Sequence, residues 1–306
     1  MRPCVSFFAT LVGAIFLAQL LLWLAPGDAA DIVANDPKLR EALVQEWGLD
    51  QSPLQRTLIF LGHAIQGDLG TSLTYRPGAS VTGLVLPASI RSLGLLLGAL
   101  LVSLVTGVGI AFHTAGRKSW LRRMIQIGSV VPVFLLAYAS MTLLNEWTFS
   151  LMQAEVISRP GWFALPDQDS FLKTCLAILV LGVGSSALTE IHVASEQELQ
   201  RIRRSKFIDA ARARGANTTP HLFWNLLGPL TTLASNRAAF FLGGLIIIEK
   251  VLHVNGVGAM LWQACRLRDY PLALGITFVA AALVCAARLA GDIVRVTVDP
   301  RLRAQR

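Results

Sequence analysis

Residues 92–116 read SLGLLLGALLVSLVTGVGIAFHTAG, and these 25 residues contain no Lys, Arg, Asp or Glu. About 20 consecutive apolar residues are enough for a helix to cross the hydrocarbon core of a bilayer. The whole chain agrees, because 54% of its 306 residues are hydrophobic and 15% are charged, whereas soluble domains carry roughly 25% charged residues. These values predict a polytopic membrane protein and exclude a free cytosolic enzyme, a secreted disulfide scaffold and a disordered chain.

Outward from this run, other apolar stretches of about 17 to 25 residues predict an all-α membrane fold with six transmembrane helices. The expected spans are Val5–Leu24, Ser92–Phe112, Met124–Asn145, Thr174–Thr189, Leu226–Ile248 and Pro271–Ala287. The first could be a cleaved signal peptide, because Arg2 precedes it and small residues follow. Its uncharged run is longer than the usual signal core of about 7–15 residues, so we expect a retained helix.

The basic residues predict the orientation. Segments 1–3, 113–123, 190–225 and 288–306 hold 16 of the 27 Lys and Arg residues, and the opposite loops hold 10. Cytoplasmic loops carry the excess of Lys and Arg, so both termini should be cytoplasmic. The net charge of +8 therefore lies between spans and does not indicate a nucleic-acid partner.

The spans divide the chain into an N-terminal helix (1–24), an extracytoplasmic loop region (25–91) and a five-helix core (92–306). The extracytoplasmic region is expected to contain a helix around Pro37–Trp47, followed by turns at Gly67–Gly70 and Arg76–Gly78. The core contains a second long loop, at about 190–225, on the cytoplasmic side. Long ordered connections tend to be functional, so this loop is the first candidate for a partner site.

Within the cytoplasmic loop, residues Glu196 to Arg214 predict a polar helix that ends at Gly215, with Pro220 near the start of the next helix. A short surface helix held between two membrane-anchored segments can fit a groove on another protein. The alternative is a solvated basic loop near anionic lipid.

The sequence Phe207-Ile208-Asp209-Ala210-Ala211-Arg212-Ala213-Arg214-Gly215 resembles the EAA loop of binding-protein-dependent ABC importer permeases, in the dipeptide/oligopeptide/nickel branch. Asp209 stands where the motif usually has Glu. Further segments resemble the same branch in the same order: residues 24–28 (LAPGD), 48–53 (GLDQSP), 67–72 (GDLGTS), 242–244 (LGG), 247–251 (IIEKV), 255–258 (NGVG), 268–271 (RDYP) and 298–301 (VDPR). The resemblance therefore covers nearly the whole chain.

The resemblance implies a type I ABC importer permease that forms half of a translocation pathway. It implies that a helix at Phe207, Asp209, Ala210, Ala211 and Gly215 couples the chain to an ATPase. It also implies four kinds of partner: a second permease, usually a paralogue, one or two P-loop ATPase subunits, an extracytoplasmic substrate-binding protein and the lipid bilayer. This chain has no nucleotide-binding motif, so ATP hydrolysis is expected on a separate polypeptide and no cofactor is expected here.

Two segments depart from the branch pattern. The stretch from Gly215 to Pro229 is shorter than usual, which puts the ATPase contacts of Thr218–Asn225 in doubt. The third span reads Val130-Val131-Pro132-Val133-Phe134 in place of the expected Ser-x-Pro-x-Phe, so path-lining residues are not carried over there.

Arg237 lies near the middle of the fifth expected span. A charge at this depth costs at least about 2.5–3.5 kcal/mol and usually faces a polar cavity or a partner. We expect it to line the translocation path and meet an anionic group of the cargo. The alternatives are an ion pair with a partner subunit and a misplaced span boundary.

The segment between the last two spans is expected to form tight turns near an outer gate. Its candidate residues are Glu249, Gly256, Gly258, Asp269 and Pro271. The alternative is an ordinary solvated loop. The five His residues fall on different loops and no CxxC pair exists, so no metal site is expected.

Two other classes of membrane protein predict different sequence features. A membrane-embedded enzyme needs a motif such as HExxH or GxSxG, which is absent. An autonomous secondary transporter predicts inverted repeats and acidic residues within the spans. Di- or oligopeptides are the favoured cargo, and nickel, metallophores and glutathione-type molecules are the alternatives.

Overall fold

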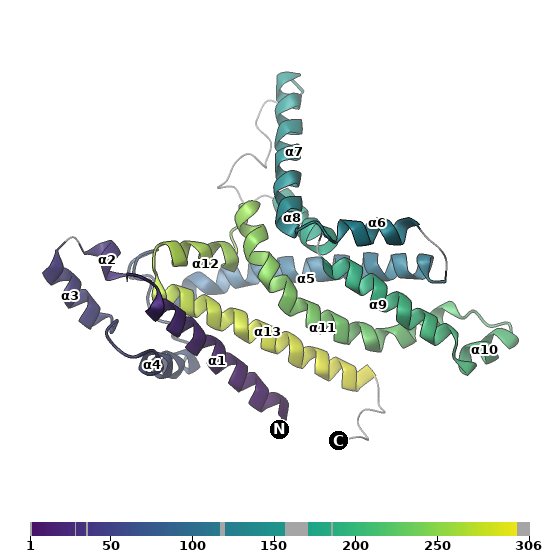
Figure 1. The fold of residues 1–306 in the computed structure, drawn as a ribbon, viewed down its shortest axis with the longest axis horizontal. Coiled ribbons are helices and arrows are strands. Elements are labelled where there is room, and N and C mark those ends of the chain that lie inside the picture. The colour runs from purple at the N-terminus through teal and green to yellow at the C-terminus, as the bar shows by residue number, and fades with distance from the viewer. Residues whose placement is uncertain are drawn as a thin grey trace. The chain divides into compact units, whose positions relative to one another are not determined.

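The computed structural model describes residues 2–27, 29–34, 36–116, 120–156, 171–184 and 186–298. These residues form α-helices, without a β-strand among them (Figure 1). The helices are α1 (Arg2–Leu24), α2 (Ala30–Val33), α3 (Pro37–Glu46), α4 (Pro53–Ile65), α5 (Val81–Thr114), α6 (Trp120–Gly128), α7 (Val133–Gln153), α8 (Phe171–Gly184), α9 (Ser186–Arg203), α10 (Lys206–Ala213), α11 (Thr219–Val251), α12 (Val257–Arg266) and α13 (Tyr270–Val298). The all-α prediction is confirmed for this part of the chain.

Three segments of the described residues are long and apolar enough to cross a membrane as single helices: Phe7–Leu24, Val81–Thr114 and Tyr270–Gly291. Two bent helix pairs, α6 with α7 and α8 with α9, raise this number to five if each pair is one span. The fifth expected span, Leu226–Ile248, lies within α11. The total of six and the cytoplasmic placement of the termini stay predictions.

The third expected span, Met124–Asn145, was wrong as a single helix. The chain bends by 93° between α6 and α7 (Figure 1). Pro132 has no N–H and its ring clashes with the carbonyl four residues earlier, which ends a helix. The amides of Val130 and Val131 instead bond the carbonyls of Ile127 and Gly128, three residues back.

The chain divides into two compact units, the first formed by residues 1–93 with 255–286. In this unit α1 packs against α4. Its core holds buried side chains from the start of α5, from α12 and from the start of α13, namely Val81, Val85, Ala88, Val257, Ala264, Leu272, Ala273 and Ile276, together with Ala64 and Leu69. Gly275 allows the close approach of α13 and α5, because a Cβ atom there would lie 2.5 Å from Cγ1 of Val81.

The sequence correctly predicted the helix near Pro37 and the glycine turns of the loop region, where Gly67, Gly70 and Gly78 have positive φ. It missed α4. Ser52 caps this helix by accepting from the Gln55 amide, and the Gln55 side chain accepts from the Ser52 amide. This capping box, with Pro53 at the first helical position, was the signal that could have predicted α4.

The second unit comprises residues 94–254 with 287–306. One core lies among the rest of α5, α8 and α11 and includes Leu95, Leu181, Phe241 and Leu245. Glycine lets α5 and α8 approach closely, because a Cβ atom on Gly98 would lie 2.8 Å from Cδ1 of Ile178. A second core joins the end of α5 to α9, α10 and the start of α11, and it positions the candidate partner site.

Candidate functional site

The predicted helix from Glu196 to Arg214 is two helices. Ser205 takes an extended conformation (φ −81°, ψ 143°) between α9 and α10. Its hydroxyl donates to the carbonyl of Ile202 at 2.5 Å, and its amide bonds the same carbonyl at 3.0 Å. These bonds take up a terminal carbonyl of α9, so the chain turns and α10 begins as a separate short helix.

Gly215 ends α10 as predicted. Its φ of +72° lies in the left-handed region that favours glycine. The Gly215 amide bonds the Arg212 carbonyl at 2.9 Å, and the Ala216 amide bonds the Ala211 carbonyl at 3.0 Å. This pair of bonds is a Schellman motif. Pro220 follows in the first turn of α11, also as predicted.

The α10 helix has an anchored face and an exposed face. Ile208 and Ala211 are 0% and 3% exposed, and Ile208 joins the core formed with α5, α9 and α11. Phe207, Asp209 and Ala210 are exposed. Of the predicted coupling residues, therefore, Phe207, Asp209, Ala210 and Gly215 are accessible to a partner, whereas Ala211 holds the helix to the unit.

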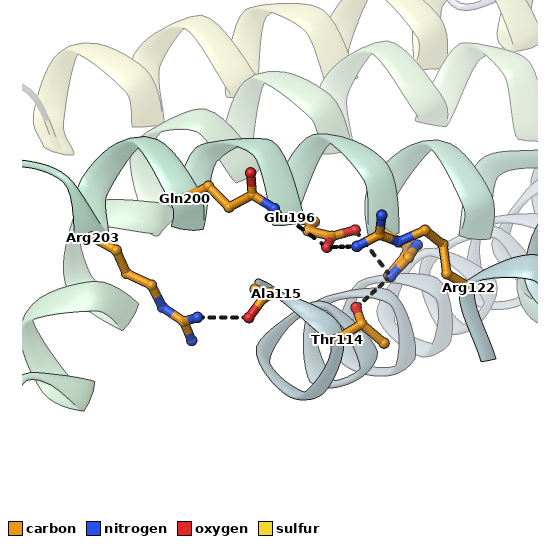
Figure 2. A network of polar contacts seen from close by, with 7 residues as sticks. Thr114, Ala115, Arg122, Glu196, Gln200 and Arg203 are labelled. Atoms are coloured by element: carbon orange, nitrogen blue, oxygen red, sulfur yellow. Dashed lines mark hydrogen bonds and ion pairs between the residues drawn. The ribbon is translucent and has the colours of Figure 1, made fainter. Parts of the chain in front are cut away.

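A buried polar network ties α9 to the end of α5 and to α6 (Figure 2). Glu196 of α9 accepts from Arg122 of α6 and from Nε2 of Gln200 at 3.5 Å. His192 of α9 is fully buried, and its Nε2 lies 3.0 Å from the hydroxyl of Thr114, the last residue of α5.

A second connection lies nearer to α10. Arg203, the last residue of α9, donates to the carbonyl of Ala115 at 2.8 Å (Figure 2). The segment leading into α10 is thus fixed to α5 and α6 by charge-assisted hydrogen bonds, which are stronger than neutral ones. The sequence did not predict this network, although His192 and Glu196 stand four residues apart on one helix face.

Arg237 forms an ion pair with Glu190 of α9. Its guanidinium also lies 5.7 Å from the ring centroid of Phe240. The sequence did not identify Glu190 as a partner, because the two residues belong to different helices. The described part of the chain thus supplies an internal carboxylate for this cation.

Asp269, one of the predicted outer-gate residues, accepts several hydrogen bonds. Its side chain is 0% exposed. Oδ2 accepts from the hydroxyl of Ser72 at 2.5 Å and from three successive amides, those of Leu73, Thr74 and Tyr75, at 3.1, 3.1 and 3.0 Å. Asp269 therefore anchors the loop that contains the GDLGTS segment, and two segments that carry the family resemblance meet here.

The remaining outer-gate candidates lie in different settings. The segment between the last two expected spans is not all turn, since α12 occupies its centre. Gly256 precedes that helix in an extended conformation. Gly258 lies within α12, and positive φ falls at His253 and Arg268 instead. Pro271 lies in the first turn of α13, and a Cβ atom on Gly70 would lie 3.6 Å from its Cβ.

Glu249 lies in the second unit, near the end of α11, and is 0% exposed. Residues 299–301 of the VDPR segment and the basic residues at 117 and 118 lie outside the described residues.

Comparison with known proteins shows the family. Residues 103–304 match the model of the binding-protein-dependent transport system inner membrane component. This chain belongs to that family. It is a membrane-spanning permease subunit of the inner membrane.

The alignments with similar proteins cover almost the full length of the permease. A Brucella suis biovar 1 (strain 1330) protein named as a peptide permease is 30% identical over 96% of this chain and 95% of its own. The oligopeptide transport system permease protein AppB of Bacillus subtilis (strain 168) is 27% identical over 95% of each chain. The glutathione transport system permease protein GsiC of Salmonella paratyphi A is 25% identical over 99% of this chain and 98% of its own.

Proposed function

We propose that this permease forms half of the translocation pathway of an ATP-driven importer, with six spans and both termini in the cytoplasm. The observation that carries the proposal is the two-faced α10 helix, with Ile208 and Ala211 buried while Phe207 and Ala210 are exposed. Such a helix can enter a groove on a partner while remaining fixed to its own unit.

The coupling step follows from this anchoring. The exposed face of α10 would sit in a cleft of a P-loop ATPase, and closure of two ATPase subunits would pull the helix. The core beneath Ile208 passes the displacement to α5 and α11, and the Glu196–Arg122 pair passes it to α6. Packed interiors have low compressibility, so the movement reaches the spans as a rigid-body rotation.

The proposed assembly contains a second permease that is a paralogue of this chain, one or two P-loop ATPases and an extracytoplasmic binding protein. The loop anchored by Asp269 would lie on the side of the binding protein, and residues 249–271 would border the outer gate. Several donors hold this loop to one carboxylate, which gives the binding protein a defined surface to dock on.

Di- or oligopeptides are the proposed cargo, because similar proteins are named as peptide and oligopeptide permeases over almost their whole length. Glutathione is the second candidate, favoured by the similarity to GsiC. Nickel and metallophores are the remaining alternative within the same branch.

The function is tested by co-expressing the tagged permease with its genomic neighbours and purifying it in mild detergent. We expect a second permease and a P-loop ATPase to co-purify. In proteoliposomes, ATP hydrolysis should rise when the binding protein is loaded with a peptide. Stimulation by glutathione or a nickel chelate in place of peptides would reassign the cargo, and purification of the permease alone would contradict the importer assignment.

Arg237 provides a separate prediction about the path. We propose that it faces the translocation path beside Glu190 and meets an anionic group of the cargo. Arg237→Gln should then reduce peptide uptake about tenfold or more, which corresponds to the loss of one charge-assisted contact of roughly 1.5–3 kcal/mol. The measurement is uptake into proteoliposomes, with co-purification of the ATPase as the check on assembly.

The ion pair requires a matched control. Arg237→Gln leaves Glu190 without its partner, which can itself destabilise the protein. The double variant Arg237→Gln/Glu190→Gln removes both charges. If the double variant restores uptake, Arg237 serves only the ion pair and the path assignment is wrong.

A further inference from the structure

The first unit contains a cavity of about 350 Å³, and its lining includes Pro271, Gly70 and Leu73, which belong to the segments of the proposed outer gate and docking loop. Its lining comes from α1, the end of α3, the connection at residues 47–51, α4, the loop at residues 68–73 and the start of α13. The lining residues that matter here are Gln19, Glu46, Arg56, Asp68 and Tyr270. The whole lining contains one guanidinium, two carboxylates, three side-chain amides and the rings of Trp47, Phe60, His63 and Tyr270.

Arg56 is a cation without a counter-ion. Its guanidinium lies 5.5 Å from the ring centroid of Tyr270, and within the described residues it makes no hydrogen bond or ion pair. Burial lowers the pKa of Arg56, yet arginine remains charged at neutral pH. The Tyr270 hydroxyl donates to the Gly27 carbonyl at 2.8 Å, which holds the ring in place. An anion in the cavity would supply the missing partner.

Gln19 gives an independent sign of a polar ligand. It continues the buried stripe of α1 formed by Leu11 and Ile15, at a spacing of four residues, and is 2% exposed. Its Oε1 has no hydrogen-bond partner among the described residues. A buried amide oxygen left unsatisfied costs about 1–3 kcal/mol. A donor from a ligand in the cavity would satisfy it.

The surroundings indicate that this ligand is a lipid. Gln19 lies five residues before the end of α1 at Leu24, or about 7–8 Å along the helix. For a helix that crosses the membrane and ends at Leu24, this position lies near the boundary between the hydrocarbon core and the headgroups. The adjacent α4 exposes Leu54, Leu58 and Ile65 at 58%, 62% and 86%, and such a face can lie against acyl chains.

We propose that the cavity binds the headgroup of a zwitterionic aminophospholipid. The phosphate pairs with Arg56, and the ammonium lies toward Glu46 and Asp68 and donates to Gln19. The acyl chains lie along the exposed apolar residues of α1 and α4. This site is additional to the proposed import function and requires only that α1 crosses the membrane.

The test uses the permease co-expressed with its genomic neighbours and placed in nanodiscs of equimolar phosphatidylethanolamine and phosphatidylglycerol. After transfer to detergent and extensive washing, native mass spectrometry counts the lipids retained. We expect phosphatidylethanolamine on the wild type and about a tenfold lower occupancy for Arg56→Gln, with partial retention for Arg56→Lys. Gln19→Leu should lower occupancy less.

The matched control is Arg40→Gln. Arg40 pairs with Asp31 at 2.7 Å in the same unit and is not part of the cavity lining, so lipid retention should match the wild type. Thermal melting of each variant shows whether it is folded. If Arg56→Gln is unfolded, Arg56→Lys, which keeps the positive charge, serves as the test variant. Equal retention by wild type and Arg56→Gln overturns the proposal, as does displacement of the lipid by a short peptide. Equal retention of phosphatidylglycerol overturns the ammonium assignment.

Discussion

Ala210→Arg removes the ATPase from the purified assembly and lowers peptide uptake by about 100-fold or more. Ala210 is exposed on α10, on the face opposite the buried Ile208 and Ala211. A long charged side chain on a surface that enters a cleft introduces both a steric clash and an unpaired charge. A penalty of about 3 kcal/mol corresponds to a loss of about 100-fold in affinity. The measurement is the ratio of ATPase to permease after co-purification, together with uptake into proteoliposomes.

Gln197→Arg is the matched control for this prediction. Gln197 is exposed on α9, and the substitution introduces the same side chain outside α10. It should leave both readouts unchanged. Retention of the ATPase by Ala210→Arg, with normal uptake, would show that α10 is not the coupling helix.

Gly215→Pro tests the end of the same helix. Proline cannot adopt the φ of +72° found at Gly215 and lacks the amide that bonds Arg212. The Schellman motif is then lost and the exposed face of α10 changes direction, so ATPase association should fall. A double substitution Asp209→Arg/Ala211→Arg would be less informative, because Ala211 is buried and an Arg there would disturb the core.

Asp269→Asn is expected to have the largest effect on stability in the first unit. The substitution removes the negative charge and replaces one carboxylate oxygen with an NH₂ group. In the native protein the Ser72 hydroxyl and three backbone amides all donate to Oδ2. Loss of a buried, charged acceptor costs about 3–5 kcal/mol. The midpoint of thermal unfolding in detergent should fall by roughly 10 °C or more.

Asp50→Asn is the control for this effect. Asp50 is an exposed carboxylate in the loop region of the same unit, and surface substitutions usually change stability by no more than about 0.5 kcal/mol. A melting temperature of Asp269→Asn equal to that of the control would show that the carboxylate does not hold the loop.

Several features followed from the sequence because their causes are local. A run of uncharged apolar residues predicts a membrane helix regardless of what packs on it, and α5 contains the whole of Ser92–Phe112. The end of α10 followed from one glycine that can adopt positive φ. The family followed from short segments in a fixed order, and the match over residues 103–304 confirms it.

Other local signals outweigh average hydropathy. The Ser52–Gln55 capping box predicts α4 within a region whose composition is typical of loop and turn. Pro132 predicts a break within Met124–Asn145, which hydropathy alone predicts as one span. In both cases average hydropathy does not register the individual residues that begin or end a helix.

The sequence by itself determined that the chain is an all-α permease of the inner membrane and where α10 ends. Only the tertiary structure decided which charged and polar groups meet. Ser72 and Asp269 are 197 residues apart and share a hydrogen bond, and Arg237 finds Glu190 on another helix. Helix propensity and hydropathy depend on residues within a few turns, whereas a hydrogen bond requires two atoms within about 3 Å. That distance is set by how the helices pack, so a single sequence does not reveal it.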